Sequence, residues 1–195
     1  MPRLNDIAEH LAGAWDLFRG DANGLERMDT SFDGFWRSFA AILLVLPVYG
    51  LYLIGEQRMA EAQEAAIDVS AGYYIFSRGA ALLVDWLAFP VLMIGIVYLL
   101  DCRSRYVPYV VAYNWGGVIL SVLVATPTIL FGFGLIPMTL ASILTLVGLV
   151  LAIRYRYIIA RVALFATIPV AAALVATEFL LSLLLADLLI RTFGI

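Results

Sequence analysis

The sequence predicts an all-α membrane protein with five transmembrane helices and an amphipathic helix near its N-terminus. Three observations lead to this prediction. The 195 residues are 64% hydrophobic, far above the roughly 45–50% typical of soluble domains. The apolar residues form runs long enough to cross a bilayer. The arginines between these runs are unevenly distributed, as expected when successive loops lie on opposite sides of a membrane.

Residues 1–34 are predicted to form a cytoplasmic region that begins with an amphipathic helix. Its apolar residues recur every three or four positions and fall within an arc of about 80° on a helix. These residues are Leu4, Ile7, Leu11, Trp15 and Phe18. The opposite face is acidic, whereas helices that sense lipid surfaces are usually rich in Lys and Arg. We therefore expect this helix to pack on the bundle or to dock a partner.

Residues 35–195 are predicted to form a bundle of five spans. The continuous apolar stretch 107–153 would be about 70 Å long as one helix, over twice the roughly 30 Å hydrocarbon core. It must therefore fold back, and the turn-forming segment Gly132-Phe133-Gly134 places the hairpin. The predicted spans are about 35–54, 79–100, 107–131, 135–153 and 162–190.

The arginines predict the orientation of this bundle. With five spans, one larger group shares the side of the N-terminus and a smaller group shares the other side. The larger group is Arg3, Arg19, Arg27, Arg37, Arg103, Arg105, Arg154, Arg156 and Arg161, and the smaller is Arg58, Arg78 and Arg191. Because positive residues stay in the cytoplasm, the N-terminus is expected inside and the C-terminus outside. The absence of Lys beside abundant Ala and Leu favours a bacterial inner-membrane protein.

Several chemistries have no support in the sequence. The chain contains one histidine, His10, and one cysteine, Cys102, so a single chain cannot form a His-based metal cluster, a Ser-His triad or a disulfide. A net charge of −3 gives no indication of nucleic-acid binding. We expect a protein that is not an enzyme and holds no metal or cofactor. Its expected partners are the lipid bilayer and other membrane proteins or further copies of itself.

Asp85 and Glu178 are the candidate functional carboxylates because each falls within a predicted span. A carboxylate in hydrocarbon costs on the order of 2.5–3.5 kcal/mol. The predicted helix starts place Asp85 about 9 Å below the outer boundary and Glu178 about 24 Å from the inner one, so both fall in the outer half. Such a pair could share a proton or hold a cation. Alternatively, each could be neutral, reach the interface or bond to a nearby hydroxyl.

Asn114 is the third candidate, in the segment Tyr113-Asn114-Trp115-Gly116-Gly117 early in the third span. It is predicted about 10 Å inside the cytoplasmic boundary. An asparagine can donate and accept hydrogen bonds between helices, and the two glycines allow close backbone approach. These properties suit a packing contact between helices, and a ligand site is the alternative.

The order of these features resembles the Yip-domain family of membrane proteins. The resemblance rests on an acidic N-terminal region, five spans, a very short hairpin between the third and fourth spans, the placement of prolines and the Tyr113–Gly116 stretch. It implies a protein without enzymatic activity that acts as a membrane scaffold or partner-binding module. The alternative function is a small proton- or cation-coupled transporter that uses Asp85 and Glu178.

Overall fold

The computed structural model describes residues 4–64 and 69–194, a region that is helical and contains no strand. The prediction of an all-α fold is therefore confirmed. Within this region five helical segments are long and apolar enough to cross a membrane. The elements are α1 (Leu4–Arg19), η1 (Ala22–Arg27), α2 (Phe32–Ser38), η2 (Phe39–Ala41), α3 (Ile42–Ala62), α4 (Ala71–Leu99), η3 (Arg103–Arg105), α5 (Tyr106–Gly132), α6 (Met138–Ala163) and α7 (Ile168–Phe193).

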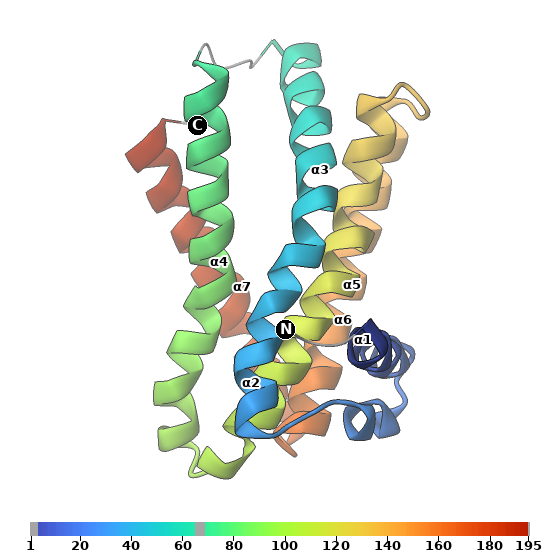
Figure 1. The fold of residues 1–195 in the computed structure, drawn as a ribbon. Helices are drawn as coiled ribbons and strands as arrows, with labels where there is room; N and C mark the ends of the chain where they lie inside the picture. The colour runs from blue at the N-terminus through green and yellow to red at the C-terminus, as the bar shows by residue number, and fades with distance from the viewer. Residues whose placement is uncertain (1–3, 65–68, 195) are drawn as a thin grey trace.

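Helix α5 lies at the centre of the bundle. It contacts α1, α2, α3, α4 and α6, while α4 also packs against α7. Figure 1 shows α1, α2 and the connection between α4 and α5 at one end of the molecule, which we call the α1 end. The α5–α6 hairpin and the end of α7 lie at the other, which we call the opposite end. Helix α1 is viewed along its axis while the long helices run up the page, so α1 lies crosswise on the bundle (Figure 1).

Glycines let the helices around α5 approach closely. A Cβ atom at Gly116 would lie 2.9 Å from Cδ1 of Ile159 on α6. A Cβ atom at Gly55 of α3 would collide with the backbone carbonyl of Thr128 on α5. Small residues at contacts are the usual means of packing helices in membranes, where apolar surface alone does not drive helices together.

The boundary between the last two long helices differs from its predicted place. The segment from Arg154 to Arg161 was expected to be a loop, but α6 continues through it to Ala163 and α7 begins only at Ile168. Arginine is a good helix former, so charge alone did not mark the end of a helix. Pro169 occupies the first turn of α7, where its missing N–H removes no helical hydrogen bond.

The first two long helices also extend beyond their predicted bounds. Helix α3 runs to Ala62 instead of ending near 54, and α4 starts at Ala71, eight residues before the predicted position 79. The side chain of Ser70 accepts a hydrogen bond from the backbone N–H of Tyr73 and caps α4. Both extensions, the polar one of α3 and the largely apolar one of α4, are helical, and their backbone groups are satisfied within the helix wherever they lie relative to a membrane.

Helix α1 packs on the bundle with a face that overlaps the predicted apolar stripe only in part, because Ile7, Leu11 and Phe18 also pack against the core. The buried side chains are His10, Ala14 and Leu17, which follow at helical spacing. The Tyr155 hydroxyl of α6 donates a 2.6 Å hydrogen bond to the carbonyl of Ala14. Within the predicted stripe, Trp15 is 49% exposed. Its neighbours Ile7, Leu11 and Phe18 are partly buried, and the side chain of Leu4 and the residue Arg3 lie outside the described part.

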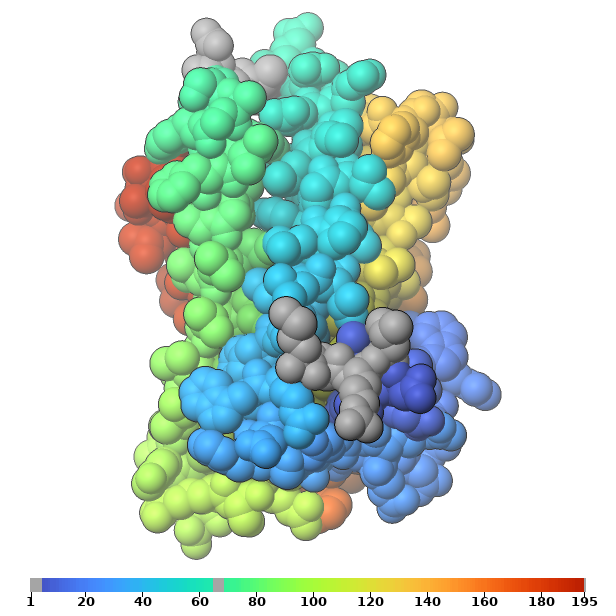
Figure 2. All heavy atoms as spheres, viewed as in Figure 1, coloured from blue at the N-terminus to red at the C-terminus, as the bar shows by residue number. Residues whose placement is uncertain are grey.

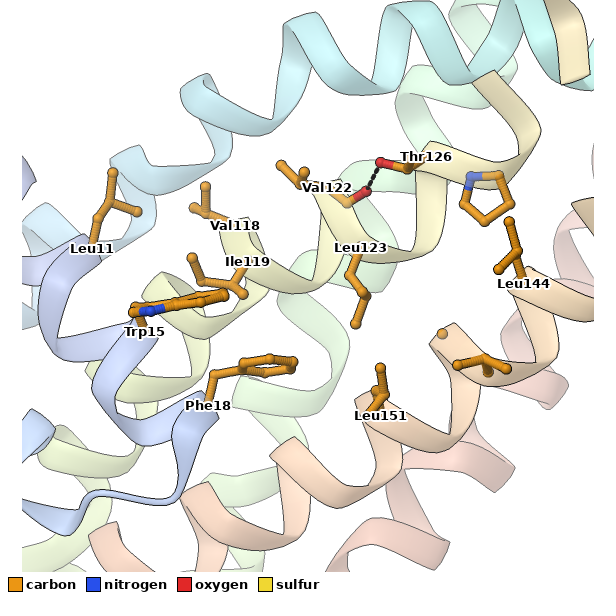
Figure 3. Close-up of a pocket in the computed structure, with 13 residues that line it drawn as sticks. Leu11, Trp15, Phe18, Val118, Ile119, Val122, Leu123, Thr126, Leu144 and Leu151 are labelled. Atoms are coloured by element: carbon orange, nitrogen blue, oxygen red, sulfur yellow. Dashed lines mark hydrogen bonds between the residues drawn. The ribbon is translucent and has the colours of Figure 1, made fainter. Parts of the chain in front are cut away.

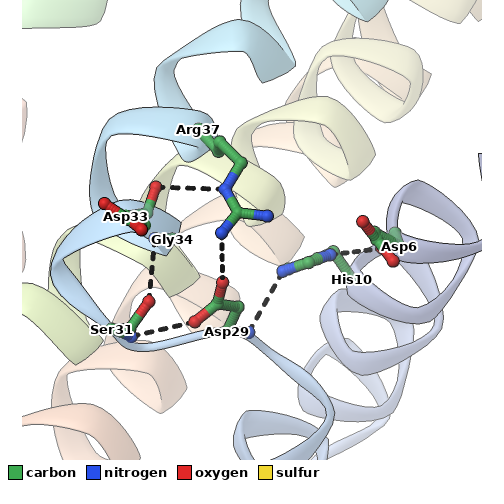
Figure 4. A network of polar contacts seen from close by, with 7 residues as sticks. All are labelled: Asp6, His10, Asp29, Ser31, Asp33, Gly34 and Arg37. Atoms are coloured by element: carbon green, nitrogen blue, oxygen red, sulfur yellow. Dashed lines mark hydrogen bonds and ion pairs between the residues drawn. The ribbon is translucent and has the colours of Figure 1, made fainter. Parts of the chain in front are cut away.

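A polar network joins α1 to α2 (Figure 4). The His10 ring stacks on Trp115 with a centroid distance of 4.8 Å, and its Nε2 accepts a 3.1 Å hydrogen bond from the backbone N–H of Asp29. The Asp29 carboxylate pairs with Arg37 at 3.2 Å. A hydrogen bond from Ser31 holds the pKa of Asp29 below its usual range. This network fixes the connection between the crosswise helix and the first long helix.

Candidate functional site

Polar side chains gather inside the bundle around three cavities that adjoin at Arg78. The cavity nearest the opposite end has a volume of about 180 Å³ and is also lined by Glu61 and Tyr74. A second, of about 390 Å³, lies between α3, α4 and α5 and reaches Arg156. A third, of about 270 Å³, lies mainly between α4 and α7. We call these three cavities together the vestibule.

Glu56 is the centre of the polar contacts in the part of the vestibule toward the opposite end. Its carboxylate pairs with Arg78 at 3.1 Å and accepts hydrogen bonds from Tyr74 at 2.7 Å and Tyr52 at 3.3 Å. The Tyr49 hydroxyl donates to the carbonyl of Arg78 at 3.0 Å. Tyr49, Tyr52 and Glu56 are spaced by three and four residues, so they share one face of α3. This arrangement neutralises Glu56 and joins α3 to α4.

Asp85 lies near the middle of α4 and lines two of the three cavities. Its carboxylate accepts a 3.1 Å hydrogen bond from the Ser182 hydroxyl of α7, and its surface is exposed to the cavities. Because α4 starts at Ala71, Asp85 lies about 21 Å along the helix. This distance exceeds the predicted 9 Å because α4 begins before the predicted start of the span, and the depth of Asp85 in a membrane stays a prediction. Among residues 4–64 and 69–194, Asp85 forms no salt bridge.

Glu178 lies in an ion pair with Arg156, at 3.0 Å. Tyr113 donates a 2.9 Å hydrogen bond to the same carboxylate oxygen. Glu178 lies about 15 Å from the start of α7, a shorter distance than the predicted 24 Å from the start of its span, because α7 begins later than predicted. Its depth in a membrane stays a prediction. Arg156, expected in a loop, is a buried partner inside the bundle, with 14% of its side chain exposed.

Arg156 has further partners that hold its guanidinium in place. Its Nη1 donates to the carbonyl of Tyr113 at 3.0 Å, and the guanidinium lies 3.5 Å from the centroid of the Tyr113 ring. The guanidinium of Arg156 and the carboxylate of Glu178 therefore each have a further partner in Tyr113. An ion pair removed from water needs such additional hydrogen bonds in order to be stable.

The structure places Asp85 and Glu178 near each other but gives them different surroundings. Ser182, the partner of Asp85, is four residues after Glu178 on α7. The hydrogen bond of Asp85 to α7 therefore lies one helical turn from Glu178. Arg156 neutralises Glu178, whereas Asp85 has a hydroxyl partner and borders the cavities. Asp85 is therefore the better placed of the two to take up a proton or cation.

Aromatic rings close the vestibule toward the α1 end. Phe89, one turn after Asp85 on α4, packs against Tyr113 at 5.5 Å and Tyr109 at 6.5 Å between ring centroids. The Tyr109 and Tyr113 rings are 6.0 Å apart. All three side chains are buried. The cavities of the polar interior consequently lie toward the opposite end, and a packed aromatic layer lies toward the α1 end.

Asn114 lies outside the vestibule. Its Nδ2 donates a 2.9 Å hydrogen bond to the Ser38 hydroxyl at the end of α2, and both residues are buried. This contact joins α5 to α2 and matches the packing role expected for Asn114. Its neighbour Trp115 supports the stacked ring of His10.

Glu56, Arg78 and Arg156 were missed as site residues. The sequence prediction placed all three outside the membrane spans because charged residues usually lie outside the spans of membrane proteins. The spacing of Tyr49, Tyr52 and Glu56 was an available signal, since it continues the face of the first span into the polar segment. In the described part of the chain, no three His, Cys, Asp or Glu side chains gather where they could hold a metal ion.

Comparisons with protein-family models, curated proteins and solved structures find no match to this chain. The resemblance to the Yip-domain family therefore stays a prediction from the sequence. The polar interior is then the main source of inference about function.

Proposed function

We propose that this chain is a small proton- or cation-coupled transporter without enzymatic activity. The observation that supports the proposal best is Asp85, a carboxylate in the middle of an apolar helix that has no cationic partner among the described residues and borders two cavities. A carboxylate at this depth is costly, and such groups usually mark ion or proton pathways.

The asymmetry of the vestibule supports a pathway with access from one side. The cavities adjoin at Arg78, toward the opposite end, and the aromatic layer of Phe89, Tyr109 and Tyr113 closes the α1 end. With the predicted orientation, the vestibule takes up its ion from outside the cytoplasm. A proton or cation on Asp85 removes a charge from the interior and would shift the balance between conformations of the α4–α7 pair.

The remaining charges of the interior suit this role because they are already paired. Arg78 is neutralised by Glu56 and Arg156 by Glu178. Glu61, the other vestibule carboxylate without an ion pair among the described residues, is exposed and lines the cavity nearest the opposite end. An added proton or monovalent cation that passes Arg78 therefore meets one unneutralised carboxylate, Asp85. Transport would need the rings of the aromatic layer to move apart. The ion pair between Arg156 and Glu178 would stay in place while they do so.

Ion flux into proteoliposomes tests this function. The wild-type chain is expected to carry a proton or monovalent cation flux, measured with an internal indicator dye, and Asp85→Asn is expected to abolish it. Asp187→Asn is the matched control, because Asp187 lies at the exposed end of α7 and pairs with Arg191. Equal flux in wild type and Asp85→Asn, with both chains folded, would remove the proposal.

A membrane scaffold or partner-binding module is the second candidate function. It is supported by the N-terminal elements, which lie across one face of the bundle toward the α1 end (Figure 2) and which we call the platform. On this platform Phe32 and Trp36 are 69% and 62% exposed. The combined variant Phe32→Ala, Trp36→Ala should then lose partners that co-purify with wild type. Phe133→Ala, at the opposite end, is the control, and unchanged co-purification in the platform variant counts against this role.

A further inference from the structure

An apolar groove of about 580 Å³ lies between α1, α5 and α6, away from the vestibule. Figure 3 shows Trp15 and Phe18 of α1 at one end of the groove and Leu144 of α6 toward the other. These α1 side chains belong to the apolar stripe that the packing of α1 on the bundle leaves partly uncovered. The groove therefore explains why this stripe is apolar although it overlaps the buried face of α1 only in part.

The dimensions of the groove match one acyl chain of one leaflet. Its α5 wall runs from Val118 to Pro127, about 14 Å at roughly 1.5 Å per residue, which is half of a hydrocarbon core of about 30 Å. The Thr126 hydroxyl faces the groove but donates to the carbonyl of Val122 at 2.6 Å. The side chains of the groove therefore offer contacts to an apolar occupant that extends along the bundle from the α1 end.

Two exposed arginines lie beside the α1 end of the groove. Arg154 donates to the carbonyl of Phe18 at 2.8 Å through one of its nitrogens and is otherwise exposed. Arg19 directly follows Phe18, is exposed, and forms no ion pair among the described residues. The neighbouring carboxylate of Asp16 is neutralised by Arg27 at 2.9 Å. Two cationic side chains without an ion pair among the described residues, Arg19 and Arg154, therefore lie at this end of the groove.

We infer that the groove binds one anionic phospholipid, with an acyl chain between α5 and α6 and its phosphate against Arg19 and Arg154. The half-exposed ring of Trp15 lies where the two parts of the lipid meet, a position that tryptophan favours at membrane interfaces. The lipid fastens α1 to α5 and α6 and adds to the contacts already made by Ala14 and Leu17. The inference does not depend on transport through the vestibule.

Quenching of Trp15 fluorescence by brominated lipids tests this inference. The full chain is reconstituted in phosphatidylcholine vesicles that contain increasing amounts of either brominated phosphatidylglycerol or brominated phosphatidylcholine. The fluorescence of Trp15 is obtained by subtracting the fluorescence of the Trp15→Phe variant from that of the unaltered chain. We expect phosphatidylglycerol to quench at lower mole fractions than phosphatidylcholine. Arg19→Gln should weaken this preference about fivefold, the effect of one arginine near an anionic surface.

A second variant tests the groove itself. Gly148 of α6 lines the groove, and a Cβ atom there meets only ordinary contacts of 3.7 Å or more. Gly148→Leu adds a larger side chain at the wall of the groove, so that quenching by both lipids should fall, and circular dichroism checks that the variant is folded. Gly95→Leu, on open surface of α4, and Arg161→Gln, away from the groove, should behave as wild type.

Three results would overturn the inference. Equal quenching of Trp15 by the two lipids would mean ordinary lipid contact without selectivity. Unchanged quenching in Gly148→Leu, with the protein folded, would place the lipid outside the groove. Protection of Trp15 from both lipids, together with cross-linking between chains at Val122, would assign the groove to a second copy of the chain.

Discussion

The ion pair between Arg156 and Glu178 allows a quantitative prediction about stability. Replacement of Arg156 by methionine removes the 3.0 Å contact to Glu178, the hydrogen bond to the Tyr113 carbonyl and the stacking on the Tyr113 ring. It leaves the Glu178 carboxylate inside the bundle with the Tyr113 hydroxyl as its remaining partner. The reverse variant, Glu178→Gln, leaves the guanidinium without its counter-charge.

The size of the effect follows from burial. The two side chains are 14% and 18% exposed, so most of the surface of the pair is covered, and loss of one partner from a fully buried pair, roughly 3–5 kcal/mol, is the upper range for each single variant. In the double variant Arg156→Met, Glu178→Gln, no uncompensated charge remains, and glutamine can still accept from Tyr113. The double variant should therefore lose only about 0.5–1.5 kcal/mol, the value of an ordinary hydrogen bond.

The assay is unfolding in mixed micelles with an increasing fraction of SDS. Circular dichroism monitors the unfolding and gives its free energy for each variant. The coupling energy is the loss in the double variant minus the losses in the two single variants. The prediction is a double variant more stable than either single variant. If the single variants stay within about 1 kcal/mol of wild type, or if their losses add up in the double variant, the ion pair does not stabilise the bundle as described.

Two further predictions concern packing and pH. Gly55→Ala forces α3 away from the Thr128 carbonyl and should lower the free energy of unfolding by about 1–3 kcal/mol. Gly50→Ala, whose Cβ would meet no neighbour, is the control and should not lower it. Equal losses for the two variants in the same SDS titration would contradict the close contact. The lowered pKa of Asp29 stabilises the fold above the ordinary value of about 3.9, and this contribution disappears as pH falls through the lower folded value. Asp29→Asn should therefore reduce the acid sensitivity of unfolding between about pH 5 and pH 2, and an unchanged profile would refute that assignment.

The five long helices could be predicted because their signals are local. Length of the apolar runs, the Gly132–Gly134 turn and the distribution of arginines each depend on residues close in sequence. The end of α6 was mistaken for the same reason. Arg156 carries the charge typical of a loop, and only its contact with Glu178, on the next helix, explains its place inside the bundle.

The packed face of α1 could not be predicted from hydrophobicity. In water the most apolar stripe is the buried one, but near lipid an apolar side chain can remain on the surface at little cost. Trp15 is therefore half exposed, while the less apolar set of His10, Ala14 and Leu17 is buried. Small residues were the better indicator of contact, as in the Gly116 region of α5.

The candidate site could be predicted only in part. Asp85 and Glu178 were found because a carboxylate in an apolar span is costly wherever the helix packs. Their partners depend on how helices far apart in the sequence meet, which a single sequence does not contain. The separate roles of the two acids follow from one arginine, Arg156, and one serine, Ser182.

Access to the vestibule is the most direct test of the proposed transport function. Ser121 lines the 390 Å³ cavity beside Asp85, and Ser121→Cys in a Cys102→Ser background gives it a single thiol. A small membrane-impermeant thiosulfonate added outside cells should label this thiol, whereas Ser142→Cys, on the exposed surface of α6, should stay unlabelled in the bilayer. Labelling of Ser121→Cys no faster than Ser142→Cys, or only from the cytoplasmic side, would contradict a vestibule open to the outside.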